Sequence, residues 1–418
     1  MKKTLSIVLS LALIFASTTI AFATTNNEQA GLLIGTTSST VENDKALIDN
    51  TLNTYFGLQF KSVKDNKPNE VDQLKNVVEA NLDSGRQVLN YETGKAKFLI
   101  ASHDADNTVI ENYSYKVVYS DLKLDNDHAI ADINLNYKIK YNFMQDVDKE
   151  QDYHKISLIK EKGKWLIYDD VYTNEFKQAF GVGTDFNKLA INAKNDYDNF
   201  KQSNSNKTIN NVNVNLITPN SVPGDYYVDY TSSLRQAAAS YALEYSDDTG
   251  STTSYSSYNN LLFNHYNPDD CQNFVSQCIW YGLGGRSSAN KDLPMDAYWW
   301  GNVSSATNDW AGTSYFYSYV TNNHANNSYG VQGIDTQVSN VITGDYVYDT
   351  SGGGHAMFIS NVIDSNGNGS TDWPEIYICA HTSNRNNHNL KALYGGISTP
   401  PSSFKFIKIV TFKWNNGD

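Results

Sequence analysis

The sequence predicts an α+β protein with two folded domains behind a secretory leader. A chain of 418 residues is longer than one ordinary core requires. Apolar residues first recur with helical spacing and then alternate with a period of two, which is typical of helices followed by an antiparallel sheet. This periodicity is lost near residue 201 and returns near residue 226. The predicted organisation is a signal peptide at 1–23, a polar tether at 24–43, an accessory domain at 44–200, a linker at 201–225 and a second domain at 226–418.

The N-terminus has the pattern of a signal peptide. Lys2 and Lys3 precede an apolar run, which ends in the small-x-small triplet Ala21-Phe22-Ala23. This run is shorter than the roughly 20 apolar residues that a membrane-spanning helix needs. We therefore expect a secreted protein, extracellular or associated with the cell wall, without a membrane span after cleavage.

The composition argues against a nucleic-acid partner. The formal net charge is -13, and only 18% of the residues are charged. Binding a phosphate backbone needs clustered cations, which this sequence does not contain. The surface is expected to consist largely of Asn, Ser, Thr and Tyr.

Two amphipathic helices are predicted at the start of the accessory domain. The first begins near Asp44, which is placed to cap it. The apolar positions of the first helix are Ile48, Leu52, Tyr55 and Phe56, and those of the second are Val71, Leu74, Val78 and Leu82.

Four antiparallel strands follow these helices. Alternating residues predict strands near 113–119 and 133–141, and then a pair at 154–159 and 165–169. Gly163 lies in the turn of that last pair, where a positive φ is needed. Helices followed by a curved meander resemble the cone-shaped fold of the nuclear-transport-factor-like superfamily. No catalytic constellation is visible in this part of the sequence, which favours a spacer or binding module.

Cysteine spacing singles out one thiol in the second domain. Three cysteines in an exported chain leave one unpaired. A helix beginning near Cys271 would separate Cys271 from Cys278 by about 10 Å, beyond the reach of a disulfide. Cys278 and Cys379 remain as a possible pair, either as a disulfide or as two buried thiols. Cys271 is the remaining cysteine.

Cys271 has the position of a nucleophile. The first turn of a helix is expected to lower a thiol's pKa and to offer N–H groups to an oxyanion. His355 follows a glycine run at the mouth of a predicted strand, and His381 closes the next strand. Adjacent strands would place one histidine as the base and the other as its orienting partner. Asn384 or Asn386 could replace His381 in that third role.

The segment around Cys271 resembles a known family, the amidase domains of secreted Firmicute proteins, over about residues 230–397. These domains belong to the papain-like group, with the NlpC-type and CHAP peptidoglycan hydrolases. The resemblance implies Cys271 as the nucleophile, His355 as the general base and His381 as the third member of the triad. One departure is Pro268-Asp269, where the family has two glycines. The segment that carries the resemblance is Asp270-Cys271-Gln272-Asn273-Phe274-Val275-Ser276-Gln277, close to the family's Gly-Asp-Cys-Thr-Asn-Phe-Val-Ser-Gln.

The resemblance also implies the activity. It indicates a thiol hydrolase that cleaves peptide or amide bonds of peptidoglycan and needs no cofactor for its chemistry. Asp270 and Trp300 are candidates for substrate binding or oxyanion support, although a carboxylate at Asp270 more often caps a helix. The alternative is a non-catalytic wall- or surface-binding protein with a papain-like fold.

A calcium-loop pattern lies between the two histidines. Residues 364–375 match D-x-[DN]-x-[DN]-G-x5-E at every specified position. Strands rather than helices are predicted on both sides, so this segment is not an EF-hand. The alternatives are a structural Ca²⁺ site and a plain hairpin tip rich in Gly and Asn. The candidate ligands are Asp364, Asn366, Asn368, Asp372 and Glu375.

Overall fold

The structure is a computed structural model that describes residues 34–205, 225–248, 260–266, 269–285 and 294–415. The chain divides into two compact units, residues 1–45 and 46–418. The predicted signal peptide and the first half of the predicted tether, residues 24–33, lie outside the described residues, whereas residues 34–43 belong to a helix and are not an irregular tether. Both predicted domains fall within the second unit, and their separation into two domains stays a prediction. None of the described helices is long and apolar enough to cross a membrane.

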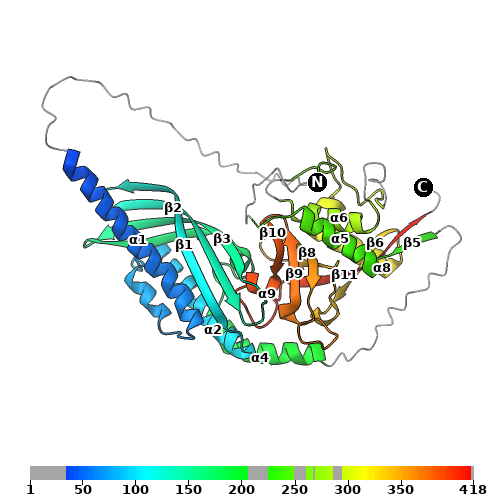
Figure 1. Cartoon of the computed structure of the whole chain (residues 1–418), viewed down its shortest axis with the longest axis horizontal. Helices are drawn as coiled ribbons and strands as arrows, with labels where there is room; N and C mark the ends of the chain where they lie inside the picture. Colours follow the sequence, from blue (N-terminus) through cyan, green and yellow to red (C-terminus); the bar gives the residue numbers. More distant parts are fainter. Residues whose placement is uncertain (1–33, 206–224, 249–259, 267–268, 286–293, 416–418) are drawn as a thin grey trace, which may run out of the picture. The chain divides into compact units, whose positions relative to one another are not determined.

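The first half of the second unit is a four-stranded antiparallel sheet with helices on one face (Figure 1). The apolar side chains of β2 and β3 point to that face and pack against the helices, because successive residues of a strand face opposite sides. The helical segments are α1 (Ile34–Lys64), η1 (Val71–Asn76) and α2 (Asp83–Asp106), and the strands, in sheet order, are β1 (Ile110–Asp125), β2 (His128–Tyr141), β3 (Asp148–Glu161) and β4 (Lys164–Tyr172).

The predicted strands are confirmed, and so is the tight turn between β3 and β4. Lys162 and Gly163 both have positive φ, at 48° and 79°. Two positive φ angles in a two-residue turn match the twist of the strands that it joins. The hairpin register is therefore set locally by this turn.

The helix predictions need correction. α1 starts ten residues before Asp44, so Asp44 lies inside the helix and does not cap it. The second predicted helix exists only as the short 3-10 segment η1, and Leu82 is exposed. The long helix α2 was not predicted, because buried polar residues such as Glu92 and His103 interrupt its apolar periodicity.

The second half is built on a larger antiparallel sheet with the order β10-β9-β8-β7-β11-β5, and β6 also pairs with β11. The strands are β5 (Asp225–Asp229), β6 (Gly330–Thr336), β7 (Tyr346–Asp349), β8 (His355–Val362), β9 (Ile376–Ala380), β10 (Arg385–Asn389) and β11 (Phe404–Asn415). Its helical segments are α5 (Ser232–Glu244), α6 (Cys271–Gly282), α7 (Asn308–Ala311), α8 (Thr313–Asn326), η2 (Val338–Asn340), η3 (Trp373–Glu375) and α9 (Leu390–Leu393). Along the chain, α3 (Glu175–Ala179) and α4 (Phe186–Ser205) lie between the strands of the first half and the elements of the second half.

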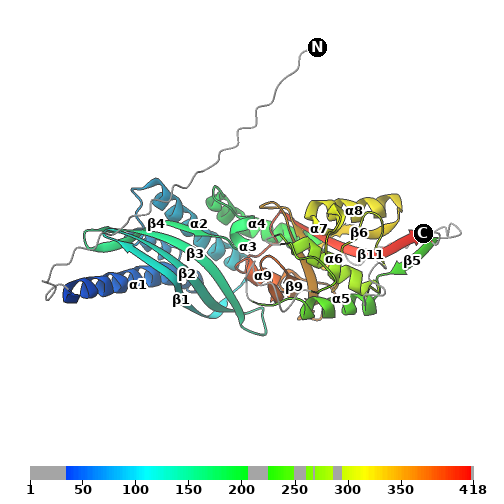
Figure 2. The same ribbon diagram turned by 90° about the horizontal axis from the view of Figure 1, so that it is seen from above.

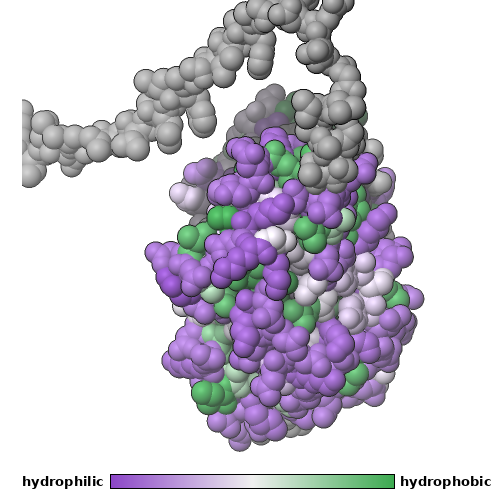
Figure 3. Space-filling model, turned by 90° about the vertical axis from the view of Figure 1, so that its left-hand side faces the viewer, coloured by the Kyte–Doolittle hydropathy of each residue, from purple (hydrophilic) through white to green (hydrophobic). Residues whose placement is uncertain are grey.

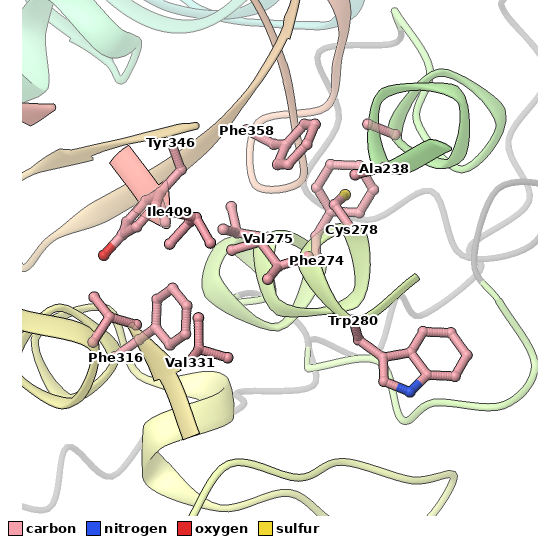
Figure 4. Packing of buried hydrophobic residues seen from close by; sticks show 14 of the residues in the cluster. Ala238, Phe274, Val275, Cys278, Trp280, Phe316, Val331, Tyr346, Phe358 and Ile409 are labelled. Carbon is pink, nitrogen blue, oxygen red and sulfur yellow. The ribbon is translucent and has the colours of Figure 1, made fainter. Parts of the chain in front are cut away.

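Helix α6 is buried along its whole length against this sheet (Figure 4). Phe274, Val275 and Cys278 of α6 share one hydrophobic cluster with Phe358 of β8 and Ile409 of β11. The helix also buries polar residues, and Asn273, Ser276 and Gln277 each form a hydrogen bond inside the protein. The packing holds the first residue of α6, Cys271, at the start of β8.

The opposite face of the same sheet packs against residues of the first half. Phe98 of α2 and Phe176 of α3 share a cluster with Met357 and Ile359 of β8 and with Trp373. Because β8 alternates in side-chain direction, its other residues face α6. The strand that begins with His355 therefore contacts both halves of this unit.

The surface is consistent with the polar composition. Figure 3 shows one face of the molecule, on which hydrophilic residues predominate and hydrophobic residues occur in small, separate groups. Figure 2, seen from above, shows α8 and β6 side by side near β11, in agreement with the pairing of β6 and β11.

Candidate active site

Cys271 is the first residue of α6 and is almost fully buried, with 7% of its surface exposed. The helix begins with a hydrogen bond from the Phe274 N–H to the Asp270 carbonyl, at 3.0 Å. The thiol accepts hydrogen bonds from the backbone N–H groups of Ala356 and Gln272. Since Ala356 directly follows His355 in β8, these contacts bring the start of α6 to the start of β8.

The prediction of a low pKa for Cys271 is wrong for this structure. Burial raises the pKa of the thiol to about 11, although the N–H groups of Ala356 and Gln272 act in the opposite direction. Desolvation disfavours the thiolate more strongly than the helix start stabilises it. The neutral thiol is therefore the resting form at pH 7.

His355 begins β8 and is buried, with 6% of its surface exposed. Burial lowers the pKa of its imidazole, while the carboxylates of Glu175 and Asp349 raise it. The ring is consequently neutral near pH 7, the form in which it can take a proton. Among the described residues, no direct hydrogen bond joins this ring to the Cys271 thiol. By the alternation of β8, the His355 side chain starts on the face that carries Met357 and Ile359, opposite to α6, so proton transfer requires the ring to turn around the start of the strand toward the thiol.

Two carboxylates near His355 were not identified from the sequence. Asp349 of β7 pairs directly with His355 across the antiparallel ladder, so both side chains lie on the same face. Asp349 is 1% exposed and accepts hydrogen bonds from the Ser351 N–H, at 2.9 Å, and from the Tyr394 hydroxyl, at 3.2 Å. The signal for this pairing in the sequence is the glycine-rich turn at residues 350–354, which joins the two strands as a hairpin.

The second carboxylate, Glu175, comes from α3 in the first half of the unit. It forms a buried ion pair with Arg385 of β10, at 2.8 Å, and Arg385 also lies 3.3 Å from Glu150 of β3. Three residues from distant parts of the chain thus form one buried charge network beside the second sheet. Sequence spacing contains no signal for such a contact.

His381 lies just beyond the end of β9. Its Nδ1 lies 2.7 Å from Asp270 Oδ2, and its Nε2 lies 2.7 Å from the Tyr245 carbonyl oxygen. The ring stacks on Phe274, with centroids 4.0 Å apart. Both nitrogens thus contact groups other than His355. The assignment of His381 as the third catalytic residue stays a prediction.

Asp270 precedes Cys271 and holds the loop in front of α6. Its Oδ1 accepts hydrogen bonds from the Tyr266 N–H, at 2.9 Å, and from the Asn273 side-chain amide, at 2.8 Å. Burial by itself raises the pKa of Asp270, but hydrogen bonds from His265 and His381 lower it to about 2. Asp270 makes no side-chain cap to a helical N–H, so the capping role considered from the sequence is not found.

The tryptophans differ in position. Trp299 and Trp310 are fully buried, with ring centroids 4.8 Å apart and ring planes tilted by 39°, which makes them core residues. Trp300 is half-buried, and its backbone pairs with Thr307. Of the three, Trp300 keeps the exposure that a substrate contact needs, and this role stays a prediction. Pro268, at the predicted departure from the family motif, lies outside the described residues.

All three cysteines are buried and free. Burial raises the pKa of Cys278, and the neighbouring Cys379 raises it further, so these two thiols lie close together. Of the two arrangements considered for this pair, the structure contains the buried thiols.

In the calcium-like loop, the carboxylate oxygens accept hydrogen bonds from N–H groups of the same loop. Asp364 accepts hydrogen bonds from the N–H groups of Asn368, at 3.1 Å, and Gly369, at 2.9 Å. Glu375 accepts from the Ser365 N–H, at 2.7 Å, and forms a capping box with Asp372 at η3. As predicted, the loop runs from strand β8 toward strand β9 and is not flanked by helices. Calcium binding here stays a prediction.

In the part of the chain that the structure describes, two groups of three His, Asp or Glu side chains place potential metal-ligating atoms within 4.8 Å of one another. One contains Asp270 and His381 with His265, and the other contains Asp148, Glu150 and His388. In the second group, His388 Nδ1 lies 3.0 Å from Asp148 and 2.9 Å from Glu150. At these distances, the two carboxylates and the His388 nitrogen form an ordinary hydrogen-bonded ion pair.

Comparison with solved structures gives weak likenesses. The intermembrane space region of the chloroplast protein ARC6 has a TM-score of 0.23 and 12% identity, covering 30% of this chain and 92% of the other. A substituted form of Rv3472, a protein of unknown function from Mycobacterium tuberculosis, has a TM-score of 0.23 and 11% identity, and the match covers 40% of this chain and 96% of the other. No curated protein matches the chain. The predicted α+β class is confirmed by the helices and antiparallel sheets. Residues 232–406, which include Cys271, His355 and His381, match the family described as "Putative amidase domain".

Proposed function

We propose that this protein is a secreted cysteine-dependent hydrolase that cleaves amide bonds of bacterial cell-wall peptidoglycan. The observation that carries the proposal is the position of Cys271, at the first residue of α6 and hydrogen-bonded to the residue after His355. Both residues lie within the region that matches the amidase family. A buried thiol and a buried neutral imidazole at the start of adjoining elements are the parts that nucleophilic attack on a carbonyl requires.

In the proposed mechanism, His355 takes the thiol proton as Cys271 Sγ attacks the carbonyl carbon. The carbonyl oxygen becomes an oxyanion, which backbone N–H groups at the start of α6 stabilise. His355 then gives its proton to the amine as the C–N bond breaks, leaving an acyl-enzyme. Water attacks this thioester, His355 accepts a proton from it, and the carboxylic acid leaves as the thiol re-forms.

The triad of the proposal is Cys271, His355 and His381. In this arrangement His381 acts through Asp270, because its Nδ1 contacts that carboxylate directly before the nucleophile. Asp349 is the second candidate for the third role, since it pairs with His355 across the strands. A carboxylate beside the base would stabilise the imidazolium that forms during attack.

The substrate class rests on location and resemblance. A signal peptide would bring the enzyme outside the cell, where peptidoglycan offers stem-peptide and cross-bridge amides. The acidic, Tyr- and Asn-rich composition does not favour a nucleic-acid partner.

Digestion of purified cell walls tests the proposal. The wild type should release fragments whose masses identify the cleaved bond, and Cys271→Ala should release none. Cys379→Ala is the matched control, because it removes a buried thiol of the same domain that has no role in the mechanism. Release by Cys271→Ala at the wild-type rate would refute the hydrolase. Wall binding without release by the wild type would support the non-catalytic alternative.

A further inference from the structure

The first half of the unit contains a cavity of about 130 Å³ between the β1–β4 sheet and its helices. We propose that this cavity is a second site, separate from Cys271, that binds a small neutral ring compound carrying one hydrogen-bond donor. An apolar cavity of about 150 Å³ holds one benzene molecule, so the size suits a single six-membered ring with one small substituent. Its apolar walls include Phe56, Phe60, Ala96, Leu99, Leu135 and Ile139.

One wall carries a buried histidine with an unused nitrogen. His154 of β3 is 3% exposed, and its Nδ1 lies 2.8 Å from Asp170 Oδ1 of β4. Its ring stacks on Tyr172, with centroids 4.4 Å apart. The Nε2 atom is buried and has no hydrogen-bond partner among the described residues. Because His154 lines the cavity and Asp170 lies behind it, the ring edge bearing Nε2 faces inward.

The hydrogen-bond pattern defines what this edge can bind. Asp170 Oδ2 accepts a hydrogen bond from the Tyr55 hydroxyl, at 2.9 Å, and its Oδ1 accepts a hydrogen bond from His154 Nδ1–H. With the N–H of the ring at Nδ1 facing Asp170, the lone pair of Nε2 faces the cavity, where it can accept a hydrogen bond. Buried polar atoms nearly always have a hydrogen-bond partner. The expected partner of His154 Nε2 is therefore a donor group on the ligand.

Charge on the same wall excludes anions. Asp152 lies two residues before His154 on the same face of β3, lines the cavity and accepts a hydrogen bond from Asn174, at 2.9 Å. Glu150 and Lys95 also line the cavity, but Glu150 is paired with Arg385 and His388, and Lys95 is paired with Glu92. Asp152 would repel a carboxylate-bearing ligand in this poorly solvated space, whereas it would not repel a hydroxyl group.

The second half of the unit closes part of the cavity. Ala392 and Leu393 of α9, together with Gly395, contribute to its lining. The Gly395 carbonyl oxygen lies 2.7 Å from His103 Nε2 of α2, which holds this segment in place. A bound ring would therefore contact residues on both sides of the junction.

The test compares phenol with fluorobenzene, which has nearly the same size but no donor, by calorimetric titration of the full secreted chain. We expect phenol to bind about tenfold more tightly, the contribution of one buried hydrogen bond. His154→Phe keeps the ring stack and should abolish this preference. His128→Phe is the matched control, since His128 also lies 2.7 Å from an aspartate, Asp127, but is exposed outside the cavity.

Ala96→Leu provides an independent test, because it fills the cavity without touching the His154–Asp170 pair. It should reduce phenol binding at least tenfold while the far-UV spectrum stays unchanged. Cys271→Ala should bind phenol as the wild type does, which separates this site from the proposed hydrolase. Equal binding of phenol and fluorobenzene, or full binding by Ala96→Leu, would overturn the inference.

Discussion

Alkylation of Cys271 is expected to accelerate with pH up to about pH 11, without a plateau near neutrality. Burial raises the pKa of this thiol to about 11. An ordinary cysteine has a pKa of about 8.5. At pH 7 the thiolate population of Cys271 is therefore about 300-fold lower than that of an ordinary cysteine. Because the thiolate is the reactive form, alkylation at neutral pH should be slow by at least this factor.

The assay is iodoacetamide labelling between pH 6 and pH 11, with the adduct on the Cys271 peptide measured by mass spectrometry. The same protein unfolded in urea is the control, because its thiol should titrate near pH 8.5. Far-UV circular dichroism at each pH establishes that the native fold is retained. The logarithm of the rate should rise by about one unit per pH unit across the native range.

A plateau at or below pH 8.5 in the native protein would refute this reasoning and indicate a preformed thiolate. The raised pKa also changes how thiol probes are interpreted. Slow labelling does not argue against catalysis here, because His355 can remove the proton only as the substrate is attacked. Activity should fall as the pH drops and His355 becomes protonated, with a midpoint below its ordinary pKa of about 6.5, because burial lowers the pKa of this ring.

Three further predictions concern groups around the site. If His381 is the third catalytic residue, His381→Gln should lower kcat at least tenfold, whereas Asp349→Asn should have the larger effect if the strand neighbour holds that role; steady-state kinetics on a peptide substrate distinguish them. Arg385→Met should destabilise the chain by about 3–5 kcal/mol in urea unfolding, because Glu175 loses its buried partner; adding Glu175→Gln should restore part of the loss, and no restoration would contradict this explanation. Chelation should lower the thermal midpoint of the wild type but not of Asp364→Asn if the loop binds calcium, and identical midpoints with chelator and with added calcium would exclude it.

Local patterns in the sequence determined several features of this protein. The four strands of the first sheet were predicted because each alternates apolar and polar residues along a half-buried surface. The helix that begins at Cys271 followed from its motif and apolar run. These features depend on neighbours within a few residues, and the chain itself contains that information.

Helix boundaries were predicted less well, for a physical reason. α2 buries Glu92 and His103, which find partners in the Tyr172 hydroxyl and in the Gly395 carbonyl. Polar residues satisfied by distant partners do not show the apolar period of a helix. Tertiary contacts therefore override the local pattern in this element.

The charged and titrating groups were decided by the tertiary structure alone. The raised pKa of Cys271 reflects burial beneath β8, which no motif reports. The contacts of His381 with Asp270 and Tyr245 and the ion pair between Glu175 and Arg385 join positions separated by 111 to 210 residues. Sequence spacing identified Cys271 as the nucleophile candidate because a helix start is a local feature. Its protonation state and its partners depend on solvent exclusion and on long-range packing, which only the folded chain establishes.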